Sequence, residues 1–140
     1  MNFKELVDRV SENKEIQTMD HSSDLTQSVG IDSVRIKKLT SRERDYWEVS
    51  QTKLSGIIGK KKISENESFE RLYGNLRARF LVRVIVDQNN NRVFDDAYAE
   101  KLGEMPSDVI ADIYNAASKY NGISKQDTDE MEKMEELEKN

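Results

Sequence analysis

The stretch FERLYGNLRARFLVRVIVD, residues 69–87, carries the strongest periodic pattern in this chain and decides its fold. After Phe69, apolar residues follow at offsets of 3, 4, 7, 11, 12, 15 and 16, the spacing of one helical face. The β-branched residues of its second half would also suit a strand. Because the helical phase continues unbroken, we predict one helix from about Glu65 to Val86 as the spine of the fold.

Signals for helix starts surround this spine. Thr40-Ser41-Arg42-Glu43 has the form of a capping box, in which the Thr side chain accepts from a first-turn amide and the Glu side chain from the amide of the cap residue itself. A helix is therefore expected to begin there, and it should stop by Gly56. Ser64-Glu65-Asn66-Glu67 repeats the pattern at the start of the spine helix.

Two shorter helices are predicted after the spine. Asp95 or Asp96 can cap the segment AYAEKL, with Gly103 beyond its end in the position that favours a left-handed residue. Ser107 can cap the last helix, which should stop at Asn121-Gly122.

The ends of the chain differ from this core. Residues 1–33 read as a short amphipathic helix, NFKELVDRVSEN, followed by a mobile polar linker over residues 11–33. Residues 34–124 form the predicted helical core, which a short strand near Val34 opens, and residues 125–140 form an acidic, flexible tail. The chain as a whole predicts a mainly α domain of four to five helices with at most a minor β-hairpin or strand pair.

The stretch VDQNNNRVFDD, residues 86–96, has three interpretations: a calcium loop, a β-hairpin turn, or a connector between helices. Counted from Asp87, a calcium loop needs glycine at its sixth position and glutamate at its twelfth, where this chain has Arg92 and Tyr98. The hairpin needs a strand before it, against the helical phase. We therefore predict a connector, in which Asn residues adopt left-handed backbone angles.

The inventory of reactive groups argues for a binding protein rather than an enzyme. The chain has no cysteine, and its only histidine, His21, falls in the predicted linker. We predict no catalytic residue, no metal site and no cofactor. The segment 126–140 holds seven acids and two lysines and so carries the whole net charge of −5. The neutral remainder gives no general attraction to nucleic acid or to a membrane, and no secretory signal or membrane span is visible.

Exposed apolar residues are the candidates for partner binding. Trp47 and its neighbour Tyr46 are either an interface anchor or part of the core. Lys60-Lys61-Lys62 with the arginines of the spine helix would form a phosphate-binding patch or a solvated surface. The candidate partner-binding residues are Phe3, Leu6, Val7, Val10, Tyr46 and Trp47.

The order of features over residues 34–124 resembles the tail assembly chaperones of long-tailed (siphovirus-type) bacteriophages and prophages. A short extended segment runs into LTSRERDYWE, and a basic and apolar helix then ends in a Val-Asp pair. A polar turn, a Phe, an acidic helix start, a Leu and a final helix with an Asn-Gly stop follow. In this chain these are Val86-Asp87, Phe94, Asp95-Asp96, Leu102 and Asn121-Gly122.

The resemblance implies a helical, self-associating protein of the host bacterial cytoplasm. Such a protein coats the tape measure protein and helps the tail tube polymerise around it, with the major tail protein as a further possible partner. Two other classes stay open: a structural tail or head-tail connector component, and a phage regulator that binds nucleic acid through the basic patch.

Overall fold

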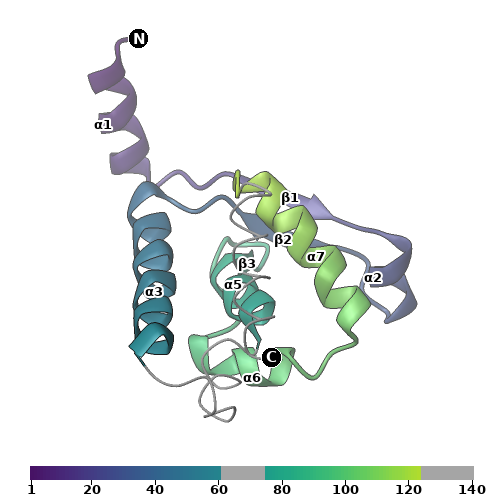
Figure 1. Ribbon diagram of the computed structural model, residues 1–140. Coiled ribbons are helices and arrows are strands. Elements are labelled where there is room, and N and C mark those ends of the chain that lie inside the picture. The colour runs from purple at the N-terminus through teal and green to yellow at the C-terminus, as the bar shows by residue number, and fades with distance from the viewer. Residues whose placement is uncertain (61–74, 124–140) are drawn as a thin grey trace.

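A computed structural model of the protein describes residues 1–60, with the backbone alone for residues 52–60, and residues 75–123 (Figure 1). The fold is mainly α, as predicted. The described residues hold six α-helices rather than four or five, and a small antiparallel sheet with one strand more than a pair. The elements are α1 (Phe3–Asn13), β1 (Thr18–His21), α2 (Asp24–Ser28), β2 (Val34–Lys37), α3 (Ser41–Lys60), α5 (Leu76–Val84), β3 (Ile85–Val86), the 3₁₀ helix η1 (Asp96–Tyr98), α6 (Ala99–Leu102) and α7 (Ser107–Tyr120).

The sheet has the strand order β1-β2-β3, with both pairs antiparallel. The predicted strand near Val34 is confirmed as β2, whereas β1 and α2 lie in the segment predicted to be a mobile linker, and that prediction is wrong. Met19 of β1 pairs with Ile36 of β2 and packs against the core. The backbone of β1 forms its hydrogen bonds with β2. These bonds, together with the core contact of Met19, hold the mostly polar segment Thr18–His21 as a strand.

The predicted spine helix is interrupted at both ends. Asn75 has a left-handed backbone (φ 65°), so no helix from Glu65 runs continuously through it. At the other end Ile85 and Val86 leave the helix and pair with Ile36 and Arg35 as β3. Ile85 and Val86 are β-branched, which favours a strand, and the backbone of β3 gains hydrogen bonds to β2. The capping pattern at residues 64–67 lies outside the described residues.

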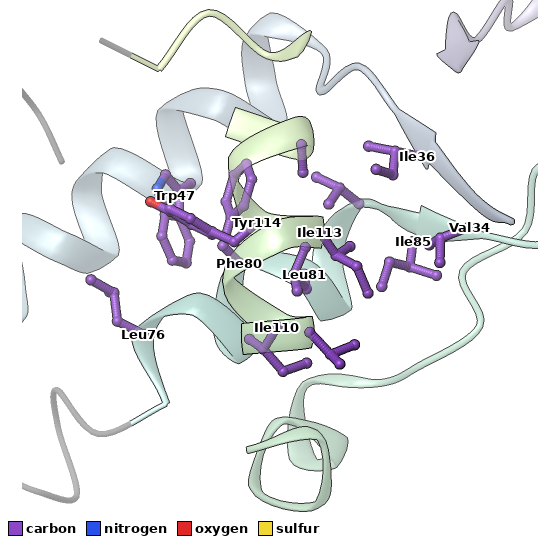
Figure 2. Close-up of a cluster of buried hydrophobic side chains, with 13 residues drawn as sticks. Val34, Ile36, Trp47, Leu76, Phe80, Leu81, Ile85, Ile110, Ile113 and Tyr114 are labelled. Carbon is purple, nitrogen blue, oxygen red and sulfur yellow. The ribbon is translucent and has the colours of Figure 1, made fainter. Parts of the chain in front are cut away.

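The core is built around Phe80 of α5, which is fully buried (Figure 2). Its ring lies 5.2 Å from the tilted ring of Trp47 on α3 and 5.7 Å from that of Tyr114 on α7, which it meets edge to face. The opposite face of α5 places Ala78 and Val82 against Ala99 of α6. Because α5 is covered on both faces, it is the central helix of the described fold.

Two helix ends differ from the predicted ones. The capping box between Thr40 and Glu43 is confirmed, with amide-to-side-chain distances of 3.0 and 3.2 Å, but α3 continues through Gly56 to Lys60. An interior glycine costs a helix only about 1 kcal/mol, which a long helix tolerates. Gly103 is right-handed rather than left-handed, and its hydrogen atom faces the Asn75 side chain, where a Cβ would collide.

The last helix keeps its predicted end and changes its predicted start. Pro106, not Ser107, is the N-cap of α7, and Ser107 is the first helical residue. At the other end Gly122 takes the left-handed backbone (φ 68°), while Asn121 has a negative φ of −86°. The Asn121 side chain instead binds neighbouring backbone, accepting from the Leu39 amide at 2.7 Å and donating to the Lys37 and Ala117 carbonyls.

The Asn-rich stretch is a tight hairpin-like turn, so the predicted connector is wrong. Val86 bridges to Arg92, and the Asp87 amide donates to the Asn91 carbonyl at 2.8 Å. Asn90 is left-handed (φ 66°), as predicted for an Asn in this turn. One oxygen of the Asp87 carboxylate accepts from the amides of Asn89 and Asn91. The first position of the rejected calcium loop therefore holds the turn together.

Candidate protein-binding surface

The helix α1 is amphipathic, as predicted, and none of its residues is buried. A capping box fixes its start, since the Asn2 side chain accepts from the Glu5 amide at 2.8 Å and Glu5 accepts from the Asn2 amide. Lys14, with a left-handed backbone, ends it. In Figure 1 the helix projects beyond the body of the fold, above the start of α3. Its stability as a separate helix therefore depends on caps rather than packing.

Four predicted partner-binding residues form the apolar stripe of α1. The exposed fractions of these residues are large for apolar ones: Phe3 80%, Leu6 37%, Val7 47% and Val10 37%. Residues three and four apart share one face of a helix, so these four lie in one stripe. Exposed apolar residues gathered on one face, rather than scattered, mark a contact surface.

The structure separates the two candidates on α3. Tyr46 is 65% exposed and lies on the solvent side of the helix, near the exposed Val49. Trp47 is 2% exposed and packs on Phe80, so it belongs to the core, the second of its two predicted interpretations. One helical step separates two side chains with opposite roles. The remaining candidate on α3 is therefore Tyr46.

A groove of about 980 Å³ lies between the end of α1 and the start of α3. Residues 14–17 and 37–43 line most of it, together with Val10, Ser11 and Asp45. Lys37, with a side chain only 11% exposed, is ion-paired with Glu43, and both residues line the groove. Burial alone would raise the pKa of Glu43, but the hydrogen bonds from Lys37 and the Thr40 amide outweigh it and lower the pKa. Glu43 thus stays ionised and neutralises the buried ammonium group.

A polar cluster of His21, Ser23 and Asp112, which we call the clasp and which the sequence did not reveal, joins β1 and the start of α2 to α7. One carboxylate oxygen of Asp112 lies 2.8 Å from Nε2 of His21 and accepts from the Ser23 hydroxyl at 2.6 Å. These two hydrogen bonds lower the pKa of the Asp112 carboxyl. Ser23 also caps α2 through a reciprocal bond with Thr26. His21 and Asp112 are 91 residues apart, so no local pattern connects them.

Two arginines of the predicted basic patch stack on core aromatics. The guanidinium of Arg77 lies 5.7 Å from the Tyr114 ring, and that of Arg83 lies 5.2 Å from the Trp47 ring. Lys61 and Lys62 lie outside the described residues. Both arginines thus cover the aromatic core with cation–π contacts.

Comparisons with protein-family models, with curated proteins and with solved structures find no match to this chain. In the part of the chain that the structure describes, no group of three His, Cys, Asp or Glu side chains is placed to hold a metal ion. None of the described helices has the length and apolar character needed to cross a membrane.

Proposed function

We propose that this protein is a non-catalytic tail assembly chaperone of a long-tailed bacteriophage or prophage. It binds the tape measure protein in the host bacterial cytoplasm and assists assembly of the tail tube. The observation that carries the proposal is α1, an amphipathic helix whose apolar stripe is exposed in the described part of this chain. The order of sequence features over residues 34–124 supports the same class.

The stripe suits a partner that is itself a long apolar-striped helix. An amphipathic helix binds by laying residues at positions i, i+3, i+4 and i+7 on a hydrophobic surface, and Phe3, Leu6, Val7 and Val10 have this spacing. Complete burial of such side chains is worth about 1.5–3 kcal/mol each. Self-association and a contact with the major tail protein belong to the same proposal.

The test is co-expression with the tape measure protein encoded beside this chain. We expect the wild-type protein to keep its partner soluble and to co-purify with it. A Leu6→Asp/Val10→Asp variant should lose on the order of 3 kcal/mol of binding, about a hundredfold in affinity, because two charges enter the apolar contact. The matched control is Asp8→Ala/Glu12→Ala on the opposite face of α1, which should bind like the wild type.

Both variants must remain folded, which circular dichroism and urea unfolding verify. An insoluble tape measure protein in the presence of folded wild-type protein would refute the proposal. Incorporation of this chain into finished particles would instead indicate a structural tail or connector component. Salt-sensitive binding to duplex DNA would indicate the regulator.

A further inference from the structure

The charges beside the apolar stripe of α1 identify the kind of segment that fits it. At 100° per residue, Lys4 and Arg9 lie one on each side of the stripe, whereas Glu5, Asp8 and Glu12 occupy the opposite face. Arg9 forms an exposed ion pair with Glu15 at 3.2 Å, a type of contact worth little and easily exchanged. An occupant of this stripe therefore needs apolar side chains with acidic neighbours.

A second copy of α1 is a poor occupant for electrostatic reasons. If two stripes faced each other, parallel or antiparallel, the margins of both would carry Lys4 and Arg9. Like charges beside an apolar seam oppose the pairing of two helices. The occupant of this stripe must come from a different sequence.

The C-terminal segment of the same chain has the required sequence. Residues 126–140, QDTDEMEKMEELEKN, place Met131, Met134 and Leu137 at helical spacing among seven acids and two lysines. Methionine adapts to irregular apolar surfaces, which suits it for contact with a stripe of mixed shapes. The net charge of −5 in this segment complements the basic margins of α1.

The described chain also ends close to α1. Ile123 packs against the core just after Asn121, and Asn121 binds Leu39, which lines the groove beside the end of α1. Seventeen residues follow Ile123. A helix of 15 residues is about 22 Å long, and α1 with its 11 residues is about 16 Å long, so the segment covers the stripe with residues left to reach it.

We propose that residues 126–140 dock on the apolar stripe of α1 in the free protein. Tethering raises the effective concentration of this segment at the stripe to the order of mM, so a weak contact suffices to shield it. The regulatory meaning of this contact rests on the proposed function: the tape measure protein must displace the acidic segment to reach α1. The docked segment thus shields the apolar stripe of α1 until the tape measure protein displaces it.

The test uses the full chain and the fact that it contains no cysteine. A nitroxide label on Met134→Cys is unique, and the amide signals of Leu6 and Val7 report its proximity. We expect these signals to lose intensity when a chain carries both the label and ¹⁵N, and to keep it when labelled ¹⁴N chains are mixed with unlabelled ¹⁵N chains. No loss at α1, or an equal loss in the mixture, which would mean docking between chains, would overturn the proposal.

Charge reversal supplies the second arm. Lys4→Glu/Arg9→Glu should restore the lost intensity, because the margins then repel the segment. Asp8→Lys/Glu12→Lys reverses the same number of charges on the opposite face and should leave the attenuation in place. Equal attenuation in both variants would refute the charge complementarity and the proposal with it. These labelling experiments need no tape measure protein. Their outcome is therefore independent of the pull-down, and either proposal can fail while the other stands.

Discussion

Replacement of Asn121 by alanine tests how the end of α7 is fixed to the sheet. The side chain accepts from the Leu39 amide at 2.7 Å and donates to the carbonyls of Ala117 at 2.9 Å and Lys37 at 3.2 Å. These contacts join the end of α7 to Lys37, the last residue of β2, and to Leu39 just after it, 84 and 82 positions earlier in the chain.

The expected loss of stability depends on which backbone groups lose a hydrogen-bond partner when the Asn121 side chain is removed. The Ala117 carbonyl keeps its bond from the Asn121 amide at 3.0 Å, so its loss is small. The Leu39 amide and the Lys37 carbonyl each lose a partner at a partly buried site, at about 1 kcal/mol each. We therefore expect Asn121→Ala to lower the free energy of unfolding by about 2 kcal/mol. Asn121→Asp keeps the acceptor for Leu39 and should show an intermediate loss.

Urea unfolding monitored by Trp47 fluorescence measures this loss, because Trp47 is buried in the core. The control is Asn115→Ala, an exposed asparagine of the same helix, which should cost less than about 0.5 kcal/mol. If Asn121→Ala costs no more than Asn115→Ala, the side-chain bridge does not stabilise the fold and the reasoning is refuted.

Three further predictions concern the core, the clasp and a close contact. Phe80→Ala should lower the free energy of unfolding by about 3–5 kcal/mol, and Phe3→Ala by less than about 0.5, because the first ring is fully buried and the second is 80% exposed; equal losses in urea would contradict this assignment. The pKa of Asp112 is lowered from its ordinary value of 3.8, so its stabilisation is complete above that pH and is lost as the pH falls through the folded-state pKa. The difference in the free energy of unfolding between the wild type and Asp112→Asn should thus become smaller below about pH 4. A difference that grows there would show that the pKa of Asp112 is not lowered by folding. Gly103→Ala should lower the melting temperature because the added Cβ collides with the side-chain amide group of Asn75. Adding Asn75→Gly should restore most of the loss, and a double variant without this rescue would show that another contact is responsible.

The candidate surface was predictable where its signal is local. The stripe of α1 follows from the spacing of Phe3, Leu6, Val7 and Val10, whereas the structure alone shows that these residues are exposed. The role of Trp47 was not predictable, because Tyr46 and Trp47 differ by one position and only the placement of α5 decides which of them is covered.

Local sequence by itself determined the elements whose hydrogen bonds close within a few residues. The capping box of α3, the end of α7 at Asn121-Gly122 and the left-handed Asn90 are examples, because a cap or a turn is completed by its own neighbours. Tertiary structure alone decided the strand β1, the exit of Ile85 from the helix and the clasp on Asp112. In each of these the stabilising partner lies far away in the chain, so the free energy that selects the conformation exists only after the chain has folded.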